Sequence, residues 1–209
     1  RPDAIDEEIL TLLKQYGVTS IELGAQSLND RVLRMNNRGH TSADVEKASK
    51  LIREFGFELG LQIMTGLYGD NDNSTVKTAE KIIAIKPDTV RIYPTIVLKD
   101  TDLAALYADG IYKPQTLDNA INLASKLYRM FTENDIRVIR LGIHSISEYA
   151  YIAGPWHPAF SELCQSQIML NEVLSKISQK GNYTLYVGKS DVSKMIGHKK
   201  CNLMHLENI

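Results

Sequence analysis

The chain has little of three things, and each shortage excludes a class of protein. Its 209 residues include only two cysteines, Cys164 and Cys201, which are too few for a disulfide-built scaffold. No apolar run approaches the roughly 20 residues that a membrane-spanning helix needs. It also lacks an excess of either charge, because 24 Lys and Arg oppose 25 Asp and Glu, a formal net charge of −1. This balance argues against a general nucleic-acid binder, which usually carries a basic excess.

No signal-peptide pattern is visible in the first residues of the sequence given. The sequence opens on Arg1-Pro2-Asp3, without a methionine or a signal-peptide pattern, so we expect a cytosolic protein and a chain that continues a longer one. A length of 209 residues allows one long domain or two short ones, with ample chain to bury a core.

Helical and strand patterns alternate over the first 95 residues. Apolar residues at helical spacing predict helices over residues 5–16, 42–55 and 74–86, the first with Asp3 as its N-cap and the second with a Thr41–Asp44 capping box. Runs rich in β-formers predict strands over 20–24, 59–64 and 89–94. This alternation is typical of βαβ units with a parallel sheet, so the fold class is α/β. Three such strands form an arc of a barrel or part of an open sheet.

The regular alternation ends after Pro94. The pattern then predicts a short helix over 102–108, long helices over 116–134 and 159–178, a β-rich run over 136–143 and a strand near 183–187. We therefore expect two regions, an α/β part at 1–95 and an α+β extension at 96–209.

Polar side chains follow or lie within the predicted strands, where parallel α/β proteins bind ligands. Gln26 ends the first strand, Gln62 lies within the second, and Arg38 follows Gln26 by twelve residues. Amides match ribose hydroxyls or an amino acid, and a guanidinium can bind a carboxylate in bidentate fashion. Each residue also has a structural interpretation, as a satisfied strand amide or a surface charge, and His40 fits an ordinary loop histidine.

Four motifs occur in order at fixed spacing: Arg-Pro-Asp at 1–3, Ile-Glu-Leu-Gly-Ala-Gln-Ser at 21–27, Asn-Arg-Gly-His-Thr at 37–41 and Gln-Ile-Met-Thr-Gly-Leu at 62–67. Together they resemble the radical S-adenosylmethionine (SAM) enzymes, in the branch of the Elongator catalytic subunit, with oxygen-independent coproporphyrinogen III oxidases as more distant relatives. Gly-Pro-Trp-His-Pro-Ala-Phe at 154–160 resembles bacterial members less specifically. The resemblance implies the C-terminal part of a partial (β/α)6 TIM-like barrel, strands 4–6, followed by an α+β extension.

The resemblance also implies roles for three residues. Gln26 matches a SAM-contacting glutamine, Arg38 the arginine that binds the methionyl carboxylate, and Gln62 a residue that contacts the ribose. The [4Fe-4S] cluster of the family needs a loop of three cysteines, and the two cysteines here are 37 residues apart. We therefore expect SAM as cofactor, cluster ligands outside this chain and no cluster chemistry from the chain alone. An electron donor such as flavodoxin or ferredoxin is implied as well.

The activity implied for the whole protein is cleavage of SAM to a 5′-deoxyadenosyl radical. The substrate is then tRNA, at a wobble uridine as in the Elongator branch, or alternatively a small molecule such as a porphyrinogen. A non-catalytic RNA- or partner-binding module is a third interpretation, resting on the basic stretch Lys189–Lys200. That stretch also fits a solvated helix face, and Trp156 in its Pro-bounded turn fits a packing anchor.

Overall fold

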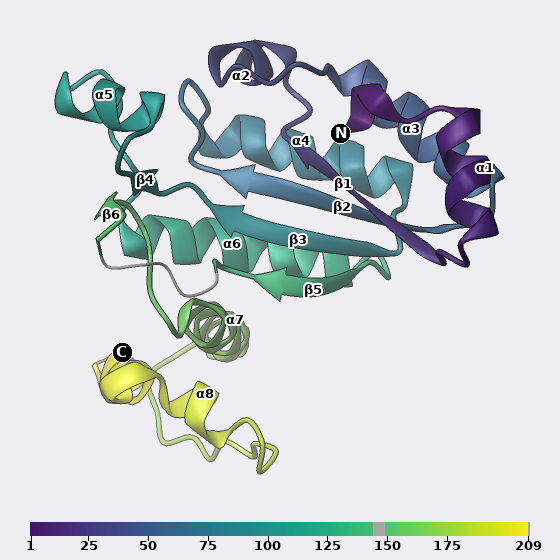
Figure 1. Ribbon diagram of the computed structural model, residues 1–209. Helices are drawn as coiled ribbons and strands as arrows, with labels where there is room; N and C mark the ends of the chain where they lie inside the picture. Colours follow the sequence, from purple (N-terminus) through teal and green to yellow (C-terminus); the bar gives the residue numbers. More distant parts are fainter. Residues whose placement is uncertain (144–148, 209) are drawn as a thin grey trace.

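A four-stranded parallel sheet organises the protein (Figure 1). The computed structural model describes residues 1–143 and 149–208. The strands are β1 (Ser20–Gln26), β2 (Glu58–Thr65), β3 (Thr89–Pro94) and β5 (Arg137–Leu141), and they lie side by side in that order. All three pairings are parallel, so the carboxyl ends of the strands share one edge of the sheet. The predicted α/β class and parallel sheet are confirmed.

The helices between the strands cover one face of this sheet (Figure 1). They are α3 (Ser42–Glu54), α4 (Asp72–Ile85) and α6 (Leu117–Thr132). Successive residues of a strand point to opposite faces, so alternate residues of β2 and β3 face these helices. Leu61 and Ile92 are fully buried there. The opposite face keeps the intervening residues, among them Gln62, which is only partly buried.

Capping side chains fix where the helices begin. Thr41 and Asp44 form the predicted capping box of α3, each side chain accepting from the other's backbone N–H. The helix predicted over 5–16 is confirmed as α1 (Glu7–Gln15), but the predicted N-cap, Asp3, is wrong, because the N-cap is Asp6. The Asp6 carboxylate accepts from the backbone N–H of Ile9 at 2.8 Å, whereas Asp3 belongs to the short 3-10 helix η1 (Pro2–Ala4).

Several short elements were not predicted. Helix α2 (Asp30–Met35) follows β1, and strands β4 (Val97–Leu98) and β6 (Tyr151–Ala153) form an antiparallel pair. Elements of two to six residues carry too few positions for a hydrophobic period to show. Helix α5 (Asp102–Ala108) matches its prediction.

The C-terminal region packs on the sheet through α7 (Phe160–Lys176), which lies beside α6 (Figure 1). Cys164 is fully buried at this contact, where its carbonyl accepts from the Ser125 hydroxyl at 3.1 Å. Burial raises the pKa of the Cys164 thiol to about 12, so this thiol is inert at neutral pH. The chain ends in α8 (Val192–Ile196), the 3-10 helix η2 (His198–Lys200) and α9 (Cys201–Glu207).

The expected strand at 183–187 is wrong, because these residues have no strand conformation. A strand needs the backbone of a neighbour to pair with its own. Here the segment lies against α7 instead, and Tyr183 and Leu185 line a cavity with Met169 and Val173. Within the described ranges, no helix is long and apolar enough to cross a membrane.

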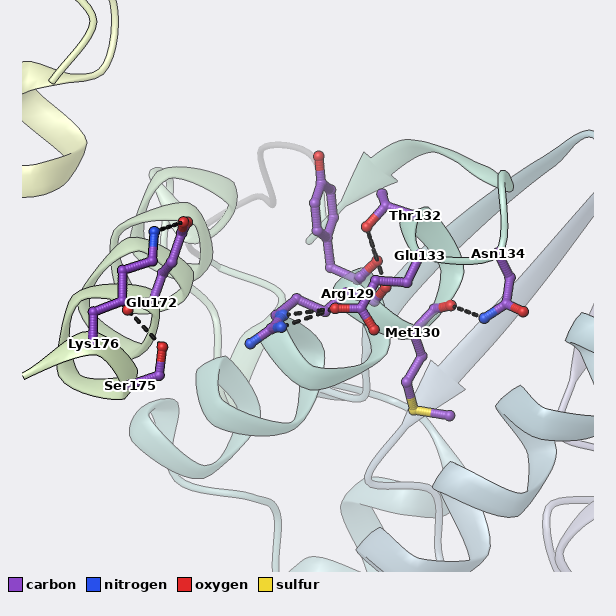
Figure 2. A network of polar contacts seen from close by, with 9 residues as sticks. Arg129, Met130, Thr132, Glu133, Asn134, Glu172, Ser175 and Lys176 are labelled. Atoms are coloured by element: carbon purple, nitrogen blue, oxygen red, sulfur yellow. Dashed lines mark hydrogen bonds and ion pairs between the residues drawn. The ribbon is translucent and has the colours of Figure 1, made fainter.

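Exposed ion pairs lie along α6 and along α7, and each pair joins residues of the same helix. Figure 2 shows Arg129 bound to Glu133 along α6 and Lys176 bound to Glu172 along α7, at 2.8 and 2.9 Å. Such pairs one helical turn apart stabilise their own helix by about 0.2–0.5 kcal/mol. The attachment of α7 therefore depends on its buried contacts with α6.

The sheet continues past residue 95, because β5 pairs with β3. The division of the chain into two regions at residue 95 stays a prediction. A boundary there would separate β5 from the three strands of the same sheet that precede it.

Truncating the core of the sheet should be costly. We expect Leu61→Ala to lower the free energy of unfolding by about 2–5 kcal/mol, because Leu61 is fully buried and a cavity would remain. Leu12→Ala is the matched control, since Leu12 is 51% exposed on α1, and its change should stay within about 0.5 kcal/mol. Urea unfolding measures both. Equal losses would contradict this description of the core.

Candidate functional site

Gln26 ends β1 in an unusual backbone conformation. Its φ of 63° is left-handed, a region that non-glycine residues seldom adopt. The Ala25 carbonyl accepts from the Ser27 N–H at 2.7 Å, which closes a γ-turn centred on Gln26. This turn coincides with an irregularity in the β1–β2 register, between Gly24 and Gln26.

The turn places the Gln26 amide over Gly24. A Cβ added at Gly24 would lie 2.5 Å from Nε2 of Gln26, so the amide occupies the space that a side chain at this position would fill. Gly24 is the register partner of Gln62 on β2. Paired residues of neighbouring strands point to the same face, so the Gln26 and Gln62 side chains share the face opposite the helices.

Arg38 reaches the same face from the loop between α2 and α3. It is exposed, and its Nη2 lies 3.8 Å from Sδ of Met64. Met64 is two residues beyond Gln62 on β2, so both side chains point the same way. The structure thus places Gln26, Arg38 and Gln62 on one face of the sheet, over the carboxyl-terminal halves of β1 and β2.

Three contacts hold the Arg38 loop. The Asp30 carboxylate accepts from the Ser42 N–H at 2.7 Å, and Asn36 exchanges two hydrogen bonds with the backbone of Tyr68. His40 is 6% exposed, and its Nε2 lies 3.1 Å from the Ala25 carbonyl oxygen. Arg38 is therefore carried by a loop that is fixed on several sides.

A charged brace crosses the sheet toward the amino ends of the strands, on the face that carries Gln62. Nε of Arg91 on β3 lies 2.8 Å from Oε2 of Glu22 on β1, and Nη1 of Arg91 is 3.3 Å from the Tyr93 hydroxyl. The Tyr93 contact and the charge of Glu22 raise the pKa of Arg91. The pair passes over Gly60 of β2, where an added Cβ would be 3.1 Å from Cγ of Glu22. We had not predicted this brace, although the alternation of β1 and β3 placed both charges on that face.

The end of β2 is covered by the segment before α6. The Thr65 hydroxyl donates to Gln115 at 3.1 Å, and the Tyr112 hydroxyl donates to the Gly66 carbonyl at 2.7 Å. Burial raises the pKa of Tyr112 to about 12, so its hydroxyl keeps its proton at neutral pH. Gly66 has a φ of +72°, and an added Cβ would lie 2.7 Å from Oε1 of Gln115. These contacts attach the segment before α6 to the end of β2.

The residues present fit SAM but do not fit the iron–sulfur cluster. Amides and a guanidinium at one mouth suit the amino-acid and ribose portions of SAM. The thiols do not suit an iron–sulfur cluster, since Cys164 is buried beside α6 and Cys201 is exposed near the C-terminus. Within the described ranges, no group of three or more His, Cys, Asp or Glu could hold a metal ion.

The remaining candidates have structural partners. In the basic stretch 189–200, Lys194 pairs with Asp191 at 2.9 Å. Trp156 packs against the Tyr151 ring, with centroids 5.9 Å apart.

Comparison with known proteins identifies the family of the chain. Residues 1–82 match the Radical SAM superfamily, and residues 87–169 match the Radical_SAM C-terminal domain. The chain is 33% identical over 128 residues to a tRNA uridine(34) acetyltransferase of Methanocaldococcus jannaschii, covering 60% of this chain and 24% of that protein. It is 29% identical over 130 residues to human Elongator complex protein 3, covering 61% and 24%. The chain thus spans about a quarter of the length of these relatives.

Solved structures show the same fold. The archaeal Elp3 of Methanocaldococcus infernus, with an N-terminal deletion, superposes with a TM-score of 0.76 at 27% identity, over 83% of this chain and 41% of that one. Coproporphyrinogen III oxidase of Escherichia coli superposes with a TM-score of 0.53 at 19% identity, over 64% and 31%, and shows the fold alone.

The chain belongs to the radical SAM superfamily. Within it, the chain is similar to tRNA uridine(34) acetyltransferases and to Elongator complex protein 3. The resemblance expected from the four sequence motifs is confirmed.

The hydrogen bond that Asp30 accepts at the Arg38 loop should make the free energy of unfolding depend on pH in the acidic range. The hydrogen bond from the Ser42 N–H lowers the pKa of Asp30 below its usual 3.8. A carboxyl whose pKa is lower in the folded state than in the unfolded state stabilises the fold at pH values above its unfolded-state pKa. This stabilisation is lost as the pH falls through the folded-state pKa. We expect Asp30→Asn to lose less stability than wild type between pH 5 and the acid transition, measured by urea unfolding. Asp109→Asn, an exposed carboxylate, is the control. Identical acid profiles for Asp30→Asn and wild type would disprove this role.

Proposed function

We propose that the mouth formed by Gln26, Arg38 and Gln62 binds SAM. Arg38 pairs with the methionyl carboxylate, Gln62 with the ribose hydroxyls, and Gln26 contributes its amide beside them. The observation that carries the proposal is the arrival of three polar side chains at one face, from a strand end, a loop and a strand interior.

The surroundings of the three residues support a ligand of this kind. Gly24 and Gly60 lack side chains on the same face, and this lets the Gln26 amide and the Glu22 side chain lie close to the backbone there. Arg91 is paired with Glu22, whereas the Arg38 guanidinium lies beside Met64 at the mouth, where it can receive a carboxylate. A charge-assisted, bidentate contact of this type contributes about 1.5–3 kcal/mol.

For the whole protein we propose a radical SAM enzyme that modifies a uridine of tRNA. The proposal is supported by the names of the relatives, tRNA uridine(34) acetyltransferase and Elongator complex protein 3. SAM and a reduced [4Fe-4S] cluster together supply radical hydrogen abstraction, and the protein positions SAM and shields it from water. The cluster ligands lie outside this chain in our proposal, and a donor such as flavodoxin or ferredoxin supplies the electron. The oxidase alternative has support from the fold alone.

Arg38 offers the direct test of SAM binding. Arg38→Ala removes the guanidinium, and we expect SAM to bind roughly 10- to 100-fold more weakly by calorimetric titration. Arg38→Lys keeps the charge but loses the planar fork, so its affinity should fall between the two. Folding should hardly change, because the side chain is exposed.

The matched control for this titration is Arg31→Ala, which removes an exposed arginine on α2 and should leave affinity unchanged. Equal affinity of wild type and Arg38→Ala would return Arg38 to the status of a surface charge.

The second test concerns the cluster. We expect anaerobic treatment of this 209-residue chain with iron and sulfide to give no cluster absorbance and no SAM cleavage, because it has only two thiols, one of them buried, where the family's cluster needs three. The same treatment of a full-length relative is the positive control. A stable cluster on this chain alone would refute the placement of the ligands elsewhere.

A further inference from the structure

His40 joins the two segments that carry Gln26 and Arg38. It lies in the loop two residues beyond Arg38, and its ring is buried against the end of β1. Its Nε2 lies 3.1 Å from the Ala25 carbonyl oxygen. A carbonyl oxygen only accepts hydrogen bonds, so Nε2 carries the proton and donates it.

The carbonyl that His40 contacts is the one that closes the turn at Gln26. The Ala25 oxygen already accepts from the Ser27 N–H at 2.7 Å, and the imidazole supplies its second donor. A left-handed non-glycine residue costs of order 1–3 kcal/mol and persists only when its surroundings hold it. Contacts from His40 on one side of the turn and from Thr78 to Ser27 and Leu28 on the other are placed to do so.

The same contact fixes the loop. Arg38 precedes His40 by two residues, so an anchor at His40 limits how far the guanidinium can move from β2. One imidazole therefore connects the loop of Arg38 to the strand end that carries Gln26.

We propose that His40 is a positioning residue for SAM, acting through the Ala25 carbonyl to hold Gln26 and Arg38 at their spacing. This inference rests on the proposed SAM site. It assigns a role to a side chain that, from sequence alone, fits an ordinary loop histidine.

Three substitutions separate positioning from bulk. His40→Gln keeps an N–H donor at about the reach of Nε2, His40→Asn shortens the donor by one methylene, and His40→Leu removes it. We expect His40→Gln to bind SAM within about 3-fold of wild type in calorimetric titration. His40→Asn and His40→Leu should bind about 10-fold more weakly. Thermal unfolding of each variant shows that the chain is folded.

A second measurement needs no ligand. The Ser27 amide donates to the Ala25 carbonyl, so its hydrogen exchange reports whether the turn at Gln26 is held. We expect exchange at Ser27 to quicken in His40→Asn and His40→Leu and to stay near wild type in His40→Gln. The amide of Ile92, in the buried core of β3, is the internal control.

The outcomes are distinguishable. If wild type does not bind SAM, the proposed function fails, and Ser27 exchange alone then decides whether His40 holds the turn. If all three variants bind SAM like wild type, or if His40→Gln is as weak as His40→Leu, the positioning role is overturned. Unchanged Ser27 exchange in every variant also overturns it.

Discussion

The structure depends on the burial of one face of a four-stranded parallel sheet beneath α3, α4 and α6. Because side chains alternate along a strand, this burial determines where every other residue of β1 to β3 must point. The apolar set, including Leu61 and Ile92, is committed to the helices. The intervening set is committed to the opposite face, and it is there that Gln62, Met64 and the Glu22–Arg91 pair lie. The packing of the apolar face thereby determines which face of the sheet carries the polar and charged side chains.

Much of this arrangement could be predicted from the sequence because it depends on local periodicity. The strand over 89–94 and the capping box at Thr41 and Asp44 follow from short-range patterns that packing does not override. The expected strand at 183–187 is absent because a strand forms only when it pairs with another strand. The sequence of one segment does not reveal whether such a partner exists. The fourth strand of the sheet, β5, was visible as a β-rich run, but its partner was not.

The candidate site, too, could be predicted from the sequence only in part. The positions of Gln26 and Gln62 relative to their strands could be predicted, whereas the left-handed turn at Gln26 could not, because nothing in its residue type requires a positive φ. The brace between Glu22 and Arg91 links residues 69 positions apart (91 − 22), a pairing that only the strand order explains. The contact from His40 to Ala25 is of the same non-local kind.

The strand order has one more consequence. In the part of the chain that the structure describes, β1 and β5 are the outermost strands of the sheet. An outermost strand presents backbone N–H and C=O groups that another strand can pair with, which is a known route to self-association. Charged residues oppose such contacts, and β1 carries Glu22 while β5 carries Arg137 and Arg140. Joining the β1 side of one copy to the β5 side of another would use two different surfaces, so it would be a head-to-tail contact, the kind that extends into a filament when it does not close into a ring.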